Sequence, residues 1–139
     1  HLDESIAKHG GTANPIFALM RHTALYENQS DRDKAINAIT RVLGQFENLY
    51  RNLGDVENGF PKEIPLCELE GREQYDPAML EENLMFGSPD TVIQKLKKYQ
   101  ALGVNEFIYY ASMGLSHEAQ QRSLSMFVKE VMPEFKEAL

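Results

Sequence analysis

The segment that most constrains the fold runs from residue 84 to residue 110, LMFGSPDTVIQKLKKYQALGVNEFIYY. It begins with the short apolar run LMFG, which predicts a strand over 84–87. Ser88, Pro89 and Asp90 then open a helix, because Ser is a good cap, Pro suits the first helical position and an acid suits the second. Gly103 ends that helix, and EFIYYA at 106–111 predicts the next strand. A strand, one helix and another strand are typical of a parallel sheet.

The rest of the chain extends this alternation. IFALMRHTALYE at 16–27 predicts a buried strand, while residues 1–15 indicate a helix remnant or a loop. Ser30 is the predicted cap of a helix that ends at Gly54, with Asp33 in its first turn. Apolar residues follow at helical spacing; they are Ile36, Ile39, Val42, Leu43, Phe46, Leu49, Tyr50 and Leu53.

A last helix follows the loop SMGLSHE. Its predicted inward face consists of Leu124, Phe127, Val128 and Val131, and Pro133 closes it.

Each helix has one main apolar stripe, so the helices are expected to cover one face of the sheet. The strands show little polar alternation, which indicates that both of their faces are buried, as in a barrel wall. Three strands cannot close a barrel. The predicted fold class is therefore α/β, with a parallel sheet that forms an incomplete part of a barrel within residues 1–139.

Residues 54–83 differ from the rest of the chain. Three prolines, three glycines and many acidic residues interrupt any sustained period there. A long loop inside a compact domain is uncommon and usually functional or disordered, so we interpret the segment as a candidate lid.

Charge and cysteine content narrow the function classes. The net charge of −7 and a pI near 5.1 argue against a nucleic-acid or anionic-membrane partner. Lys95, Lys97 and Lys98 form the densest basic cluster, which indicates a solvated helix face. The single cysteine, Cys67, excludes an internal disulfide and fits the reducing cytoplasm. No apolar run approaches the roughly 18 residues of a membrane span.

The last 56 residues resemble the C-terminal end of the bacterial-luciferase-like flavin monooxygenase family. FGSPDTVIQKLKKYQALGV and NEFIYYASMGLSHEAQQRSLSMFVKEVMPEFKEAL carry the resemblance, and LSMFVKEVMP at 124–133 matches most closely. RHTALYENQSDRDKA is similar to the strand-to-helix step before the lid in these enzymes. Each piece alone is weak, but the same pieces in this order are fairly specific.

The resemblance implies a (β/α)8 TIM barrel that uses reduced FMN, or the related deazaflavin, with a small organic substrate and usually oxygen. The matched elements would be the last three strand–helix units of that barrel, and residues 54–83 would stand where the family carries an active-site lid. Such a barrel needs about 250 residues. Because the chain is shorter and begins with His1 rather than Met, we expect a C-terminal piece whose catalytic residues lie in the missing N-terminal half. That piece alone is expected not to turn over.

Candidate cofactor contacts lie where barrel strands end. The helix opening at Ser88 could hold a phosphate, or Ser88 only caps its helix. In the loop 112–117, Gly114 allows close approach to a flat ring, Met113 offers soft packing and His117 could donate to a flavin carbonyl or a substrate oxygen. The alternative for this loop is a turn with Ser116 as a helix cap.

Two arginines are candidate substrate or lid residues. Arg21 and His22 are neighbours in the first strand, so one of them faces the barrel and the other faces the helices. A barrel-facing Arg21 would attract an anionic group. Arg72 is the arginine of the lid segment, and a closing lid often brings a cation to a bound anion, although surface solvation also explains it.

The sequence contains no motif of a zinc site, a serine hydrolase or a P-loop nucleotide-binding protein. His117-Glu118 begins like a zinc-protease motif, but position 121 is Gln, and the four histidines and one cysteine lack metal-ligand spacing. There is no Gly-x-Ser-x-Gly elbow and no Walker loop.

A hypothesis of another class is an independent, non-enzymatic α/β interaction module. Its exposed sheet edges would pair with a partner or another copy, so a homo-oligomer is expected for the isolated chain under either hypothesis. A native reading frame extending well upstream of His1 would favour the enzyme.

Overall fold

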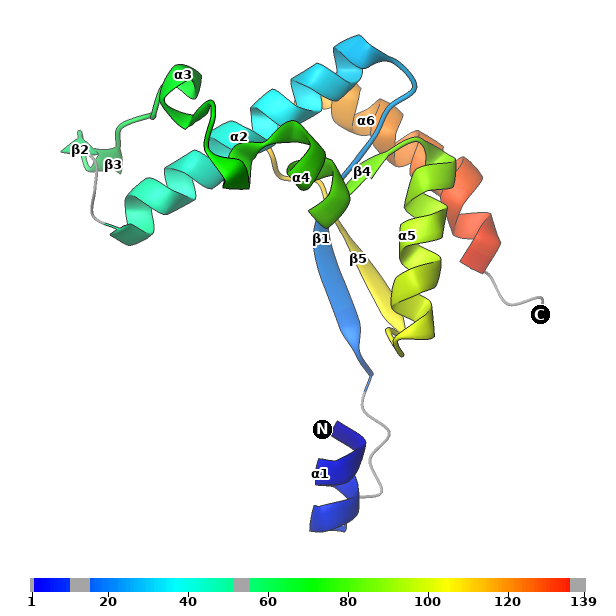
Figure 1. Ribbon diagram of the computed structural model, residues 1–139. Coiled ribbons are helices and arrows are strands. Elements are labelled where there is room, and N and C mark those ends of the chain that lie inside the picture. Colours follow the sequence, from blue (N-terminus) through cyan, green and yellow to red (C-terminus); the bar gives the residue numbers. More distant parts are fainter. Residues whose placement is uncertain (1, 11–15, 52–55, 136–139) are drawn as a thin grey trace.

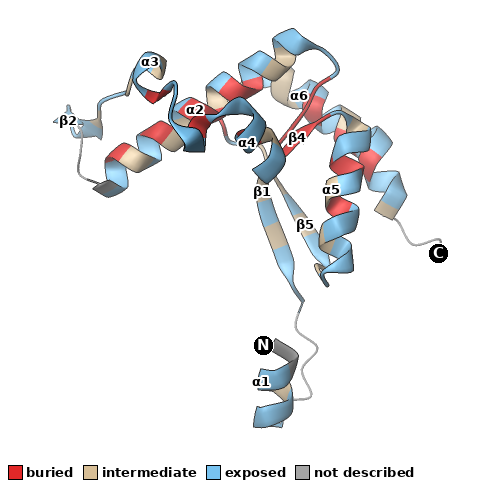
Figure 2. Cartoon of the chain, viewed as in Figure 1, coloured by how far each residue is buried: buried red, intermediate tan, exposed pale blue. Residues whose placement is uncertain are grey.

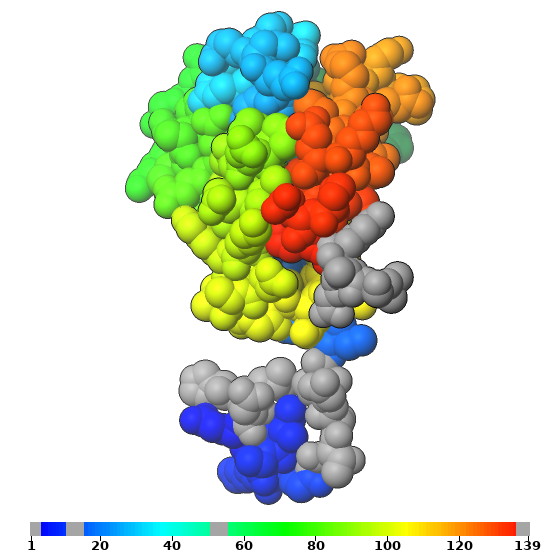
Figure 3. All heavy atoms as spheres, turned by 90° about the vertical axis from the view of Figure 1, so that its right-hand side faces the viewer, coloured from blue at the N-terminus to red at the C-terminus, as the bar shows by residue number. Residues whose placement is uncertain are grey.

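The computed structural model describes residues 2–10, 16–51 and 56–135 of the 139 (Figure 1). The described part is mixed α/β with a parallel sheet, as the alternation of strands and helices predicted. In Figures 1 and 3 the first helix, α1 (Leu2–His9), lies apart from the sheet.

The main sheet has three parallel strands in the order β4-β1-β5. β1 (Ala18–Leu25) lies in the middle and pairs on both sides, with its amino half along β5 (Glu106–Tyr110) and its carboxyl half along β4 (Met85–Gly87). In a closed (β/α)8 barrel, successive strands are neighbours in chain order, which would place β4 between β1 and β5. The described sheet therefore differs from three successive barrel units.

The helices cover both faces of the sheet, so the prediction of a single covered face was wrong. The connection from β1 to β4 runs one way along the sheet and the connection from β4 to β5 runs the other way. Because such crossovers are right-handed, their helices lie on opposite faces. The first is α2 (Gln29–Arg51), and the second is α5 (Pro89–Ala101), joined on its face by α6 (His117–Met126).

Two hydrophobic clusters reflect this arrangement. Ala24 and Phe86 point into the cluster beneath α2, whereas the adjacent Leu25 and Met85 point into the cluster beneath α5 and the last helix. Figure 3 shows α5, in yellow-green, and the last helix, in orange and red, side by side on the latter face.

One face of the sheet, the face to which Ala24 belongs, is exposed in its amino half. Met20 is 52% exposed and its partner across the strand pair, Ile108, is 47% exposed. Figure 2 shows that the buried residues gather at the carboxyl ends of the strands, while the other ends of β1 and β5 are largely exposed. The prediction that the strands are buried on both faces is correct only for the carboxyl end.

The helix caps follow the sequence at two of three sites. The Ser88 hydroxyl accepts the Thr91 N–H at the start of α5, and the Ser116 hydroxyl accepts the Ala119 N–H at the start of α6. The predicted cap of α2 was wrong, because the Asn28 side chain accepts the Asp31 N–H at 2.9 Å and Ser30 lies inside the helix. Asn caps as well as Ser, and it stands two residues earlier. The predicted stop of α2 at Gly54 lies outside the described residues.

The last helix buries a narrower stripe of side chains against the sheet than the sequence predicted. Ser123, Phe127 and Val131 are buried at a spacing of four, while Leu124 and Val128 are about half exposed, so the prediction was wrong for the latter two. A π-helical turn at Phe127–Val131 and a 3-10 turn at Met132–Phe135 continue the helix.

The segment predicted as one long loop consists of short elements in its described part. It contains the strands β2 (Val56–Glu57) and β3 (Phe60–Pro61), then α3 (Leu66–Leu69), a 3-10 turn (Glu73–Tyr75) and α4 (Pro77–Asn83). These short elements are held by local hydrogen bonds, namely the pairing of β2 with β3 and helix caps such as Asp76 at α4. Because they do not depend on a repeated apolar pattern, the sequence did not predict them. Figure 1 shows α3 and α4 alongside α2.

A glycine lets this segment approach α2. A Cβ at Gly44 would lie 2.6 Å from Cδ1 of Leu69, which is fully buried. Glu47 adds polar contacts, because it accepts the Tyr75 hydroxyl and pairs with Arg72 at 3.4 Å. The segment is therefore packed on α2.

Candidate functional site

The carboxyl ends of the three strands meet at one edge of the sheet because the strands are parallel. β1 leads through Tyr26 into α2, β4 leads directly into the Ser88 cap, and β5 leads into the loop that contains Met113. Ligands of open parallel sheets bind at this edge. It is the candidate site.

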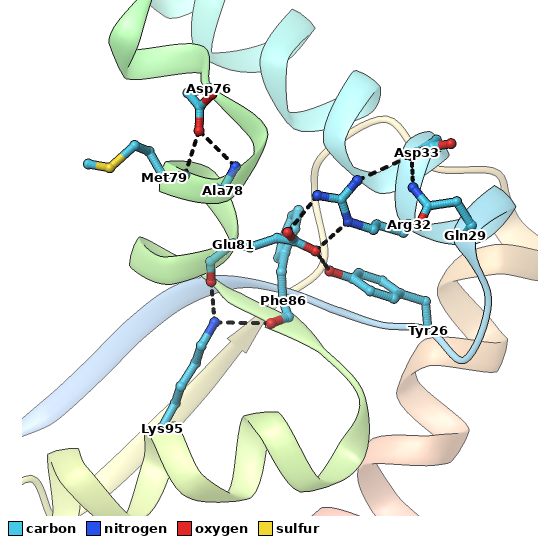
Figure 4. A network of polar contacts seen from close by, with 10 residues as sticks. All are labelled: Tyr26, Gln29, Arg32, Asp33, Asp76, Ala78, Met79, Glu81, Phe86 and Lys95. Atoms are coloured by element: carbon cyan, nitrogen blue, oxygen red, sulfur yellow. Dashed lines mark hydrogen bonds and ion pairs between the residues drawn. The ribbon is translucent and has the colours of Figure 1, made fainter.

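Glu81 of α4 is the centre of the polar network at this edge (Figure 4). Its carboxylate accepts two hydrogen bonds from Arg32, 2.7 Å from Nε and 2.6 Å from Nη2, and a third from the Tyr26 hydroxyl. A bidentate guanidinium–carboxylate pair is geometrically specific and strong. The network, which we call the Glu81 clasp, joins α4 to α2 and to the end of β1.

The clasp fixes protonation states. The Arg32 hydrogen bond holds the pKa of the Glu81 carboxyl below its usual range, helped by the Tyr26 hydrogen bond and opposed by burial. Burial, together with the Glu81 hydrogen bond, raises the pKa of the Tyr26 phenol. Near neutral pH, Glu81 is an anion and Tyr26 is a neutral donor.

Lys95 of α5 fastens the other side of α4. Its ammonium donates to the backbone oxygens of Glu81, Leu84 and Phe86, the last two at 2.8 and 3.0 Å (Figure 4 shows two of the three bonds). These carbonyls include groups at the end of α4 that the helix itself leaves without donors. Burial lowers the pKa of Lys95, and the nearby Glu81 charge opposes that shift.

A pocket of about 530 Å³ opens beside the clasp. Its described lining includes three carboxylates, from Glu27, Glu81 and Glu82, and two cations, from Arg32 and Lys95. Both cations are already paired, with Glu81 and with backbone oxygens respectively. The described lining therefore offers carboxylates and neutral polar groups rather than a free positive charge.

Ser88 lines this pocket, but its hydroxyl is used within α5. It accepts the Thr91 N–H at 3.3 Å and lies 3.1 Å from the Thr91 hydroxyl. The capping role that the sequence left open is thus present in the structure.

The loop after β5 lies at a different pocket, of about 570 Å³, between that loop and α2. Met113 is fully buried in the cluster beneath α2, whereas Gly114 has φ +79° and open space where a Cβ would stand. His117 is exposed as the first residue of α6 and is absent from this pocket's lining. The structure therefore brings Met113 and Gly114 together but keeps them apart from Ser88.

The two arginines lie elsewhere again. Arg21 on β1 lies opposite Tyr109 on β5, and Tyr109 packs on the face covered by α5 and the last helix. Nη1 of Arg21 donates to the Met20 carbonyl. Arg72 lines a third pocket, of about 430 Å³, and pairs with Glu47.

Sequence reasoning missed the Glu81 clasp and misjudged one lysine. Lys97 and Lys98 are exposed, as predicted for a solvated face, but Lys95 is half-buried. Its position one residue before the buried Leu96 was the available signal. Nothing local links Arg32 with Glu81, since 49 residues separate them.

His22 lies on the face opposite Arg21, where it forms a second unpredicted cluster. Its ring stacks on that of Tyr110 with centroids 4.3 Å apart and planes 25° apart. In the described part of the chain, His22 Nδ1 is buried and has no hydrogen-bond partner, and burial lowers the pKa of this histidine.

The described residues contain neither a metal-binding cluster nor a membrane-spanning helix. In residues 2–10, 16–51 and 56–135, no group of three or more His, Cys, Asp or Glu side chains is arranged to hold a metal ion. Within the same part of the chain, no helix combines the length and the apolar character needed to cross a bilayer.

Comparison with known proteins gives one relative of note. The chain is similar to the oxygenase component of flavin-dependent trigonelline monooxygenase from Acinetobacter baylyi, with 27% identity over 138 residues, which is 99% of this chain. The chain spans 38% of the length of that relative. No protein-family profile matches the chain, and no solved structure does.

Proposed function

We propose that this chain is part of the oxygenase component of a flavin-dependent monooxygenase, which oxidises a small organic substrate with reduced flavin and oxygen. The similarity to the A. baylyi enzyme carries the proposal, because it extends over nearly the whole of this chain rather than over one motif. The luciferase-like pieces of the sequence, from FGSPD to LSMFVKEVMP, agree with the same class.

The proposed cofactor is reduced FMN, with deazaflavin as the alternative. When bound, a reduced flavin supplies the electrons that activate oxygen. Gly114 fits the approach of a flat ring, because apart from its chain neighbours no described residue has an atom within 4 Å of the place where a Cβ would stand. We assign His117 as a donor beside the ring and Met113 as support beneath the loop.

The phosphate of FMN fits less well at Ser88. The Ser88 hydroxyl is engaged with Thr91, and the described pocket lining has more carboxylates than cations. A phosphate needs donors that are not already committed. We therefore derive no phosphate contact from the clasp pocket, and Ser88 stays a prediction.

The proposed lid, residues 54–83, would act through α4, since the Glu81 clasp holds this helix at the edge of the sheet. Arg72 stays a proposed lid cation, and it would have to leave Glu47 to meet an anionic substrate. Arg21 would face the pocket only after a rearrangement of β1.

The wider assembly is also a proposal. A (β/α)8 barrel requires β4 between β1 and β5 and further strands to cover the open face at Met20 and Ile108. The exposed, unpaired Cys67 agrees with a cytoplasmic location.

Flavin binding by the whole protein tests the proposal. The full-length chain from its gene would be titrated anaerobically with reduced FMN, reduced FAD and reduced deazaflavin, and binding would be followed by flavin fluorescence. We expect saturable binding of reduced FMN, weakened by Gly114→Val but not by Gly71→Val, which also replaces a glycine of positive φ with open space around it. Absence of binding by all three flavins would refute the proposed function.

A second candidate is a non-enzymatic interaction module that self-associates. The exposed apolar residues near the amino ends of β1 and β5 favour it, because large apolar patches on a protein surface mark association sites. Sedimentation velocity of this chain, with and without Met20→Lys, tests it. A dimer that Met20→Lys dissociates, together with no flavin binding by the whole protein, would support the module.

A further inference from the structure

The pocket of about 430 Å³ lies between α2 and the segment packed on it, residues 66–79. We call it the α2 pocket. Figure 1 shows the elements that form its two walls, with α3 and α4 alongside α2. Both walls belong to the described part of this chain, so neither a missing strand nor a partner is needed to form them. A volume of this size matches the cavities that hold small organic molecules.

The inner surface of the α2 pocket is buried and mainly apolar. Ile36 of α2, Leu69 of α3 and Tyr75 line it and are all buried. The Tyr75 hydroxyl is already committed, because it donates to the Glu47 carboxylate. Tyr75 therefore offers the pocket its ring rather than a polar group, and an apolar molecule would be favoured here.

One polar side chain in this inner surface has no partner. Thr40 of α2 lines the pocket and is only 7% exposed. Within residues 2–10, 16–51 and 56–135, no hydrogen bond involves its hydroxyl. The oxygen is nevertheless not sealed inside the protein, because in that part of the chain the fully enclosed side-chain atom without a partner is Nδ1 of His22. The Thr40 hydroxyl thus opens into the pocket, where it is free to bond a ligand.

The charged groups of the lining select a neutral ligand. Glu70 and Glu73 are exposed, and Arg72 between them is paired with Glu47 at 3.4 Å, so an anion would meet carboxylates and a committed cation. The Asp76 carboxylate caps α4 through two backbone N–H groups. A charged group among the buried apolar side chains would lose its water without gaining a partner.

We infer that the α2 pocket is a binding site for a small neutral organic molecule with an apolar ring and one oxygen, which hydrogen-bonds to the Thr40 hydroxyl. A threonine hydroxyl donates and accepts, so the oxygen can belong to a hydroxyl or a carbonyl group. The inference goes beyond the proposed function and does not rest on it, because none of the proposed flavin contacts belongs to the described lining of this pocket. An occupant would touch both walls and so fasten residues 66–79 to α2.

Matched probes test the ligand class. The whole protein would be titrated at pH 7 with 4-fluorophenol, 4-fluorotoluene and 4-fluorobenzoate, and binding would be followed by ¹⁹F NMR. The first two have nearly the same shape and differ in one hydroxyl, and the third carries a negative charge. We expect 4-fluorophenol to bind about fivefold more tightly than 4-fluorotoluene, the effect of one net hydrogen bond, and 4-fluorobenzoate to bind most weakly. No binding of 4-fluorophenol, equal binding of the first two probes, or a preference for the benzoate would overturn the inference.

Methionine methyl signals locate the bound probe. Met79 lines the α2 pocket, whereas Met113 lines the pocket beside Gly114 and Met126 lines a pocket beside α6. The methyl groups would be ¹³C-labelled, and the Met79 signal would be assigned with Met79→Leu. We expect the aromatic probe to shift the Met79 signal and to leave those of Met113 and Met126 in place. A bound probe that leaves the Met79 signal unchanged would overturn the inference.

Substitution of Thr40 isolates the hydroxyl. Thr40→Val keeps the shape of the side chain and removes the hydroxyl, so the preference for 4-fluorophenol over 4-fluorotoluene should disappear. Thr40→Ser keeps the hydroxyl and should keep the preference. Thr23→Val is the matched control, because Thr23 is buried too but lies outside the described lining, and its hydroxyl donates to the Arg21 carbonyl at 2.9 Å. A preference that survives in Thr40→Val would refute the role of this hydroxyl.

The stability of the same variants tests whether the hydroxyl is unpaired in the free protein. Thr40→Val removes no hydrogen bond, so its Tm should equal or exceed that of the parent. Thr23→Val removes one and should lower the Tm. A Tm of Thr40→Val below that of Thr23→Val would mean that the Thr40 hydroxyl is already bonded, and the inference would fail.

The inference and the proposed function fail in different ways. If the whole protein binds reduced flavin but no probe shifts the Met79 signal, this inference is refuted and the proposed function stands. If 4-fluorophenol binds beside Met79 while no flavin binds, the α2 pocket stands as a site and the proposed function is refuted.

Discussion

Replacing Glu81 with glutamine should destabilise the chain by about 2 kcal/mol. The amide keeps the shape of the side chain but loses the charge, and its NH₂ would face a donor, either the Arg32 guanidinium or the Tyr26 hydroxyl. Hydrogen bonds to charged groups contribute about 1.5–3 kcal/mol, and breaking a fully buried pair costs about 3–5 kcal/mol. The side chains of Arg32 and Glu81 are 26% and 27% exposed, which places this pair toward the lower values.

Thermal unfolding measures the effect. For a chain of this size, about 2 kcal/mol corresponds to a fall in Tm of about 6 °C. Glu82→Gln is the matched control, because Glu82 is the next residue of α4 and is exposed, so its Tm should stay within about 1 °C of the parent. Equal Tm values for the two variants would refute the clasp as the attachment of α4.

Three further predictions concern the same edge of the sheet. Lys95→Met keeps the apolar stem but removes the donor to three backbone oxygens, so chemical denaturation should show a loss of about 2 kcal/mol, against little change for the exposed Lys98→Met. Gly114→Ala should cost about 1 kcal/mol from backbone strain alone, since φ is +79° and nothing surrounds the new Cβ, whereas Gly114→Asn should cost less; equal stability of all three would contradict this. Because the folded state lowers the pKa of Glu81 below 4.5, the stability that its carboxylate contributes is fully present above pH 4.5 and is lost as the pH falls through the lowered pKa. The difference in unfolding free energy between the parent and Glu81→Gln should therefore shrink below pH 4.5, and a difference that grows there would reverse the sign of the argument.

The local structure was largely predictable from the sequence. Ser88, Gly103 and Ser116 mark helix ends through interactions within a few residues, and all three helix ends lie where those residues predicted. The sequence did not identify Asn28 as the cap of α2. Asn28 and Ser30 are both good capping residues, they stand close together, and the sequence does not rank them.

The arrangement of the sheet was less predictable. Strand order depends on which strands meet, and the central position of β1 comes from pairing with residues more than 60 positions away. The strand order decides which face of the sheet each helix covers. The wrong prediction that all helices cover one face, which failed for α2, therefore followed from the assumed barrel order. The clasp and the His22–Tyr110 pair are long-range contacts of the same kind, and no local spacing indicates them.

Oxygen incorporation tests the central claim most directly. The whole protein, supplied with enzymatically reduced FMN under ¹⁸O₂, would be incubated with a panel of planar organic carboxylates that includes trigonelline, and the products would be analysed by mass spectrometry. The account predicts a product that carries one ¹⁸O atom, formed only when reduced flavin, substrate and protein are all present. Substrate that is recovered unlabelled while the protein binds reduced FMN would contradict the assignment as a monooxygenase.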